Sequence, residues 1–328
     1  MPRNRPTRFV TATVVGLVLA VVATPSPAGH FGASTFVRDV RSIPSATPTE
    51  TEFLTGARGA PATIGIHVAV PAPLSARVPA VVILHGSTGI TPTIHRWAED
   101  IGTVLGIAVA KVDSFSGRGV VETTTDPSRL PNTAMAIDAY RTLAMLAGDP
   151  RIDARRIAVL GFSDGGFAAL YASVRRFQRL YAPPGREFAA YLAFYPPCGQ
   201  RYANDEDVSE RPIRIFHGAA DDWAPIEPCR NYVARLKQLG RDADLIAYPG
   251  AHHAFDVPEL PTALRLPGAR RRGCALDERT LGVVVDSATG RPPDAACLRQ
   301  GATIGHDPRA RDDAAKRVKE ILIAAFGG

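Results

Sequence analysis

Residues 161–165 read Gly-Phe-Ser-Asp-Gly, and one more glycine follows at position 166. The apolar run Arg156–Leu160 before them predicts a buried strand, and the run Phe167–Val174 after them predicts a helix. A serine flanked by glycines between a strand and a helix is typical of a nucleophile elbow, a strained turn that holds the hydroxyl clear of the sheet. We therefore expect Ser163 to be a catalytic nucleophile; the alternative is a tight strand–helix turn without a chemical role.

Strand-like and helix-like segments alternate on both sides of this motif. Apolar runs predict strands at Val81–Leu84, Ala108–Val112, Ile157–Phe162, Ala189–Tyr195, Pro212–Phe216 and Asp244–Tyr248. Amphipathic spacing predicts helices at Thr93–Leu105, Asn132–Leu146, Gly165–Arg176, Pro228–Leu239 and Pro308–Phe326. Continuous apolar strands separated by helices indicate an α/β fold with a mostly parallel central sheet covered by helices on both faces.

Two stretches depart from this alternation. Ahead of it, short strands are expected near Ser34–Val40 and Thr51–Leu54, and Thr63–Val70 alternates like an edge strand. Residues 257–303 hold several Pro and Gly residues, two cysteines and no long periodic run. We expect them to form a surface insertion before the last helix, with a small hairpin around Leu281–Val285.

An elbow serine needs a base for its proton, and the base needs a carboxylate that orients it. Asp221, with Asp222 beside it, follows a predicted strand on a loop at the sheet edge where sites of open α/β folds lie; a solvated acidic turn is the alternative. Two histidines follow the next strand, and we assign His253 as the base and His252 as a candidate substrate-binding residue at the rim. A pair of adjacent histidines also suggests a metal site. No further Cys, His or carboxylate lies at the spacing of metal ligands, so neither a metal nor a cofactor is expected.

The loop His85–Gly89, which follows the strand Val81–Leu84, is the candidate for an oxyanion hole. We assign one backbone N–H donor to Ser87 and the second to Asp164, the residue after the nucleophile. His85 is expected to be a structural hydrogen-bonding residue at the base of this loop.

The N-terminus is typical of a secretory signal. Arg3, Arg5 and Arg8 form a basic start, Val10–Val22 is apolar, and small residues follow it. We therefore expect residues 1–28 to be removed, leaving a single domain at 29–328 that is secreted or periplasmic and has no stable membrane span; an uncleaved anchor is the alternative.

Charge gives little indication of a partner. The formal net charge is +6, and residues 1–28 carry three arginines and no acid, so the mature chain is close to +3. No basic cluster alternates with aromatic residues, so no nucleic-acid partner is expected. The densest basic run, Arg270–Arg272, is expected to be a solvated loop.

Four cysteines, an even number in a chain predicted to be exported, indicate two disulfides. Three pairings are open, and we predict Cys198–Cys229 and Cys274–Cys297. Cys198 and Cys229 each follow one of two strands that we expect to be neighbours, and the second pair would close the insertion.

The chain resembles the dienelactone hydrolase family of α/β-hydrolases over roughly residues 60–256 and 301–326. The pieces that carry the resemblance are His85–Gly89, Asp113–Gly119, Gly161–Gly166, His217–Pro225 and Tyr248–Phe255. The resemblance implies an α/β-hydrolase fold and a Ser163–Asp221–His253 triad. The family's namesakes use a cysteine where this chain has Ser163, which favours a general serine esterase over activity on dienelactone.

Substrate identity does not follow from the resemblance, because exported relatives cleave polyesters, phenolic esters or peptides. We expect a small-molecule or polymeric carboxylic ester, cleaved through an acyl-enzyme. Alternatives are a serine peptidase or an acyltransferase on the same fold, and a non-catalytic binding protein. Arg118 and Trp223 are candidate substrate-binding residues; for Arg118 the favoured alternative is a structural pair with a loop carboxylate, and for Trp223 simple packing is the alternative.

Overall fold

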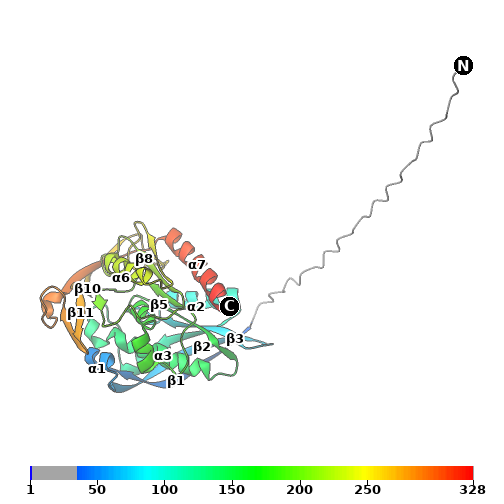
Figure 1. Ribbon diagram of the computed structural model, residues 1–328, viewed down its shortest axis with the longest axis horizontal. Helices are drawn as coiled ribbons and strands as arrows, with labels where there is room; N and C mark the ends of the chain where they lie inside the picture. The colour runs from blue at the N-terminus through cyan, green and yellow to red at the C-terminus, as the bar shows by residue number, and fades with distance from the viewer. Residues whose placement is uncertain (2–34, 328) are drawn as a thin grey trace. The chain divides into compact units, whose positions relative to one another are not determined.

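The structure is a computed structural model that describes Met1 and residues 35–327, so the predicted signal peptide lies outside the described residues. Its centre is an eight-stranded sheet with the strand order β1-β2-β4-β3-β5-β6-β8-β9 (Figure 1). The strands are β1 (Thr35–Thr47), β2 (Ala60–Ala72), β3 (Val78–Leu84), β4 (Ala108–Asp113), β5 (Ile152–Phe162), β6 (Tyr191–Phe194), β8 (Ile213–Gly218) and β9 (Ala243–Tyr248). β2 runs antiparallel to both β1 and β4, and the other neighbours are parallel.

Helices cover both faces of the sheet, as predicted. The helices are α1 (Glu50–Thr55), α2 (Pro92–Leu105), α3 (Asn132–Ala147), α4 (Asp164–Tyr171), α5 (Arg175–Tyr181), α6 (Ile226–Gln238) and α7 (Pro308–Gly327). Alternate residues of β3 show the two layers: Val81 and Ile83 belong to the core layer that includes α2 and α7, whereas Val82 and Leu84 belong to the layer that includes α3 and α4. Within residues 35–327, no helix is both long enough and apolar enough to cross a membrane.

Three predictions of local structure before the insertion are wrong. Thr51–Leu54 lies in helix α1, because Thr49 and Glu52 form a capping box that starts a helix there. The segment Thr63–Val70 belongs to β2, which is not an edge strand, because the long strand β1 pairs along its whole length. The helix predicted at Gly165–Arg176 is two helices, since Val174 leaves the helical path to form a β-bridge with Val208.

The insertion has its own small sheets, one of which includes β7 (Gln200–Arg201). β10 (Leu264–Arg272) pairs antiparallel with β13 (Leu298–Ile304), and β11 (Leu276–Thr280) forms the predicted hairpin with β12 (Val283–Asp286) and joins β7. Arg270–Arg272 therefore end a strand rather than forming a loop, because β13 supplies a partner for them.

Both predicted disulfides are present. The Cys198–Cys229 and Cys274–Cys297 pairs each have their Cα atoms 5.1 Å apart. The first joins the loop after β6 to helix α6, and the second closes the insertion between the ends of β10 and β13. β6 and β8 are neighbours in the sheet, which is the adjacency on which the first pairing was based.

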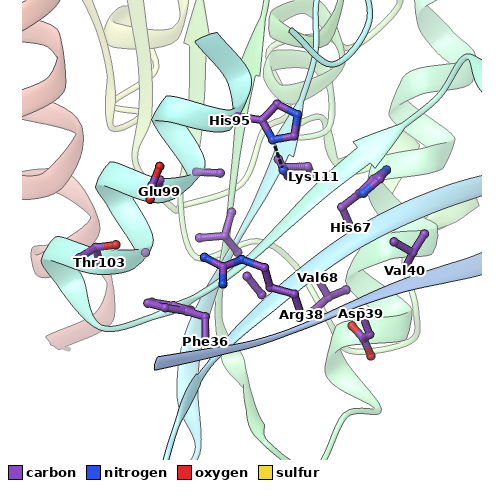
Figure 2. A pocket seen from close by; sticks show the side chains of 14 residues that line it. Phe36, Arg38, Asp39, Val40, His67, Val68, His95, Glu99, Thr103 and Lys111 are labelled. Carbon is purple, nitrogen blue, oxygen red and sulfur yellow. Dashed lines mark hydrogen bonds between the residues drawn. The ribbon is translucent and has the colours of Figure 1, made fainter. Parts of the chain in front are cut away.

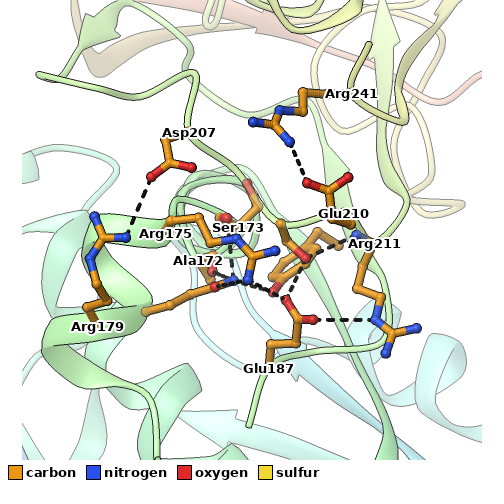
Figure 3. Close-up of polar contacts among 12 residues, drawn as sticks. Ala172, Ser173, Arg175, Arg179, Glu187, Asp207, Glu210, Arg211 and Arg241 are labelled. Atoms are coloured by element: carbon orange, nitrogen blue, oxygen red, sulfur yellow. Dashed lines mark hydrogen bonds and ion pairs between the residues drawn. The ribbon is translucent and has the colours of Figure 1, made fainter. Parts of the chain in front are cut away.

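An ionic network holds the segment that leads into β8 against helix α5 (Figure 3). Glu187 accepts a hydrogen bond from Ser209 Oγ at 2.6 Å and lies 3.5 Å from both Arg175 and Arg211. Arg179 lies 3.6 Å from Asp207. These pairs are partly or largely exposed, so each contributes only a fraction of about 1 kcal/mol to stability.

Candidate active site

Ser163 occupies a strained turn between β5 and α4. Its backbone has φ 52° and ψ −112°, a positive φ that a residue with a side chain adopts only where surrounding contacts impose it. The flanking glycines allow this turn, since a Cβ on Gly161 would overlap the carbonyl of Gly165, and one on Gly165 would crowd His85. The Gly165 N–H donates to the His85 carbonyl at 3.1 Å, which fixes the elbow against the loop after β3.

His253 and Asp221 lie beside this serine, although 90 and 32 residues separate the members of the two pairs. His253 Nε2 lies 3.0 Å from Ser163 Oγ, and its Nδ1 lies 2.7 Å from Asp221 Oδ2. An ionised carboxylate only accepts hydrogen bonds, so Nδ1 carries the proton and Nε2 is free to accept the serine hydroxyl. The arrangement can therefore take a proton from Ser163.

Asp221 is held by the backbone of its own loop, which follows β8. The N–H groups of Trp223 and Ala224 each donate to Asp221 Oδ1 at 2.9 Å, while Oδ2 is left for His253. The neighbouring carboxylate, Asp222, faces the insertion instead and accepts from Arg265 Nη1 at 2.7 Å and Thr303 N at 2.6 Å. The two adjacent carboxylates thus have different partners: Asp221 binds the histidine, and Asp222 binds the insertion.

The His253 ring is packed between aromatic side chains and is only 4% exposed. The ring centroid of Tyr195 lies 4.5 Å away and that of Trp223 lies 5.0 Å away. Tyr195 donates from its hydroxyl to the buried Asp256 at 2.5 Å, and Trp97 Nε1 donates to the same carboxylate at 2.8 Å. Burial raises the pKa of Asp256. Sequence reasoning missed Tyr195 and Asp256, because only the fold brings them under His253.

Asp164 begins helix α4, so its backbone N–H has no acceptor inside the helix and stands beside the nucleophile. Burial raises the pKa of its carboxyl group, and a hydrogen bond from Thr123 Oγ1 at 2.9 Å opposes that effect. Ser87 accepts from Thr123 N at 2.9 Å through its carbonyl and from Thr124 Oγ1 at 3.0 Å through its hydroxyl. The polar segment 123–124, which the sequence did not single out, thus ties the predicted oxyanion loop to the elbow.

Ser163, Asp164 and His253 line a cavity of about 860 Å³, large enough for a small organic ligand. Trp223 also lines it, as do Arg270, Arg271, Arg272, Cys274 and Leu298 from the insertion. The insertion therefore forms one wall of this cavity. His252 does not contribute to the wall; its Nδ1 lies 3.1 Å from the Ala220 carbonyl and helps to hold the acid loop.

Arg118 lies away from this cavity, in agreement with its structural interpretation. Its two terminal nitrogens donate to the two oxygens of Asp138 at 2.8 Å, and Nε donates to Thr47 at 2.8 Å. The side chains of Arg118 and Asp138 are 5% and 0% exposed. The partner carboxylate lies on helix α3 rather than on a loop, and the pair anchors the 310 turn Ser116–Arg118 to that helix.

Replacing Arg118 with alanine is expected to lower the free energy of unfolding by about 3–5 kcal/mol, because it leaves the buried Asp138 carboxylate without its cation. The KM of whatever protein remains folded should not change. Chemical denaturation checks the first expectation, with Arg230→Ala, which removes a partly exposed pair with Glu227, as the matched control. A loss below about 1 kcal/mol for Arg118→Ala would contradict the assigned role.

Cys274, Asp286 and Cys297 bring three metal-ligand residue types within 4.8 Å of one another. The two sulfurs are joined in a disulfide, and metals bind the free thiolate. This cluster therefore does not fit a metal ion.

Comparison with known proteins places this geometry in a family. The model of the dienelactone hydrolase family matches residues 66–269. A putative carboxymethylenebutenolidase of Methylorubrum extorquens is 24% identical over an alignment of 188 residues, and the match covers 52% of this chain and 62% of that protein. An uncharacterised peptidase of Bacillus subtilis, YuxL, is 28% identical over an alignment of 130 residues, and the match covers 32% of this chain and 20% of that protein. The chain thus spans less than two thirds of the length of these relatives.

Solved structures agree in fold. A dienelactone hydrolase-like promiscuous phosphotriesterase, P91, from metagenomic libraries covers 88% of this chain and 99% of its own, with a TM-score of 0.56 and 16% identity. A structure described as m3DLH covers 90% of this chain and 100% of its own, with a TM-score of 0.58 and 18% identity. Together with the family match over more than half of its length, the elbow and the sheet order show that the chain belongs to the dienelactone hydrolase family and has the α/β-hydrolase fold.

Proposed function

We propose that this protein is a serine hydrolase that cleaves carboxylic esters through an acyl-enzyme. The observation that supports this most directly is the hydrogen-bonded chain from Ser163 Oγ through His253 to Asp221, at 3.0 and 2.7 Å, on the wall of a cavity. Nucleophile, base and orienting acid are within hydrogen-bond reach of each other, which is the geometry that nucleophilic catalysis requires.

In the first half of the reaction, His253 Nε2 accepts the Ser163 proton while Oγ attacks the ester carbonyl carbon. The carbonyl oxygen becomes an oxyanion, and the N–H groups of Asp164 and Ser87 are our proposed donors to it, at about 3 kcal/mol for each donor. His253 then protonates the leaving alcohol as the C–O bond breaks. In the second half, water loses a proton to His253 and attacks the acyl carbon. His253 then returns that proton to Ser163 Oγ as the acyl C–O bond breaks, which releases the acid and restores the free serine.

Labelling with a fluorophosphonate, followed by peptide mass spectrometry, tests this proposal. We expect a single adduct, on Ser163, because only an activated serine reacts with such a probe. A panel of p-nitrophenyl esters, matched anilides and thioesters then separates esterase from peptidase activity. A folded protein that takes up no label and hydrolyses none of these compounds would favour the non-catalytic binding protein.

The arginines of the insertion indicate which substrate charge the cavity favours. Arg271 is half-buried in the wall of the cavity, and its guanidinium has no carboxylate partner within ion-pair distance among residues 35–327. A substrate carboxylate would supply that partner. We therefore propose that an acyl or alcohol group with a negative charge is preferred over a neutral one.

The Arg271→Gln variant is expected to raise KM about tenfold for mono-p-nitrophenyl succinate and to leave KM for neutral p-nitrophenyl butyrate unchanged. Steady-state kinetics on the two esters measure the difference, with the exposed Arg279→Gln as the control variant. An equal change for both esters would show that Arg271 does not recognise charge.

We further propose that the protein is secreted or periplasmic. The basic and apolar N-terminal residues support this, and so do the two disulfides, because disulfides persist in oxidising compartments. N-terminal sequencing of the exported protein tests it, with cleavage at or before residue 28 as the expected result.

A further inference from the structure

A second cavity lies between helix α2 and the strands β1, β2 and β4 (Figure 2). Its volume is about 410 Å³, within the range of small-molecule sites. None of its lining residues lines the cavity around Ser163. The reaction proposed above therefore makes no use of it.

Three basic side chains share the face of the sheet that lines this second cavity. Val40, His67 and Lys111 are direct neighbours across β1, β2 and β4, and Arg38, Ala69 and Val109 form the next such row. Residues directly opposite each other on paired strands project from the same face. Arg38, His67 and Lys111 thus project together, and α2 adds His95 from above (Figure 2).

Few negative charges offset these groups. Asp39 lies one residue along β1, so its side chain leaves the opposite face, where it lies 3.1 Å from Arg41 Nε. Glu99, exposed on α2, is the other acid that lines the cavity. Among residues 35–327, no carboxylate lies within ion-pair distance of Arg38 or Lys111; Arg38 stacks 5.8 Å above the Phe36 ring instead.

Lys111 has an unusual partner. Its Nζ lies 2.5 Å from His95 Nδ1, a distance at which one of the two groups must be neutral. Burial lowers the pKa of Lys111, and the charge of Arg38 lowers it further. Burial also lowers the pKa of His95, with Lys111 adding to the effect. With a neutral His95 as acceptor, the Lys111 ammonium keeps two N–H donors for another partner.

We propose that this cavity binds an organic monoanion, specifically a carboxylate on a small apolar body. Arg38 and Lys111 supply charged donors for the carboxylate, and Phe36, Ala69, Ala98 and Val109 supply the apolar wall. Because Asp39 is paired with Arg41, the two cations face only the charge of Glu99, which leaves room for one negative charge. This site is independent of the triad and does not rest on the proposed hydrolase activity.

The chain contains four lysines, Lys111, Lys237, Lys316 and Lys319, which allows a direct test. Labelling the protein with lysine that carries 13C at Cε gives each lysine one 13C NMR signal and leaves its N–H donors in place, and 1-naphthoate is titrated in. We expect the Lys111 signal to move with saturation and the other three to stay in place. Neutral 1-naphthamide and inorganic phosphate, which carry only the apolar body or only the charge, should each bind at least about tenfold more weakly.

Titration calorimetry measures the naphthoate affinity of two matching variants. Arg38→Gln should weaken naphthoate binding about tenfold, whereas Glu99→Gln should strengthen it severalfold, because it removes the one opposing charge. Misfolding cannot explain affinity changes of opposite sign in two exposed, conservative replacements, and thermal melting confirms that both variants are folded. Equal affinity for naphthoate and naphthamide, or an unmoved Lys111 signal at saturation, would overturn the proposal.

Discussion

Replacing Ser163 with alanine is expected to lower kcat for ester hydrolysis by about a millionfold, while the melting temperature stays close to that of the parent protein. The hydroxyl is the only group of the proposed triad that bonds covalently to the acyl carbon, so the remaining members have nothing to activate. Alanine fits at the elbow because the strained backbone there is fixed by the Gly165–His85 and Ser163–Phe194 hydrogen bonds, which do not involve the side chain.

The matched control for Ser163 is Ser128→Ala. Ser128 lines the same cavity, but it lies in the 310 turn Pro127–Arg129 and its hydroxyl donates to Asp126. Its replacement should change kcat less than about threefold. Steady-state kinetics with p-nitrophenyl butyrate measure both variants. If Ser163→Ala keeps about a hundredth of the parent activity or more, another group is the nucleophile and the mechanism proposed here is wrong.

The adjacent histidines should respond very differently to the same substitution. His253→Ala is expected to lower kcat by about 10^4-fold or more, because it removes the base that takes the Ser163 proton. His252→Ala should leave activity within about threefold of the parent protein, since its Nδ1 faces the Ala220 carbonyl and its ring does not line the cavity.

Added imidazole gives a further test of which histidine is the base. The His253→Ala variant leaves a ring-sized space between Tyr195 and Trp223, and free imidazole in that space can replace the missing base. We expect partial rescue of kcat for His253→Ala that saturates with imidazole, and no effect on Ser163→Ala. A greater loss in His252→Ala than in His253→Ala would mean that the base has been assigned to the wrong residue.

Much of the framework could be predicted because the signal lies within single segments. The order of strands and helices around β3, β4 and β5 follows from apolar runs and amphipathic spacing, and the family follows from short motifs such as Gly161–Gly166. Helix α1 was missed although its capping box, Thr49 and Glu52, is a local signal. Two other errors fell where tertiary contacts outweigh local preference. Val174 ends a helical run because Val208 is available as a bridge partner, and β2 is not an edge strand because β1 lies alongside it.

By itself the sequence determined the elbow and the candidate triad residues, because glycine spacing and the position of a loop after a strand are local properties. The cysteine pairing depended on which strands are neighbours, and so on the tertiary structure. The tertiary structure decided what surrounds the elbow and the triad. It separated Asp221 from Asp222 by giving one to His253 and the other to the insertion, and it placed Arg270–Arg272 in the wall of the cavity. It also gathered Arg38 and Lys111 on one sheet face, since strand register, which no single segment specifies, fixes which distant residues become neighbours.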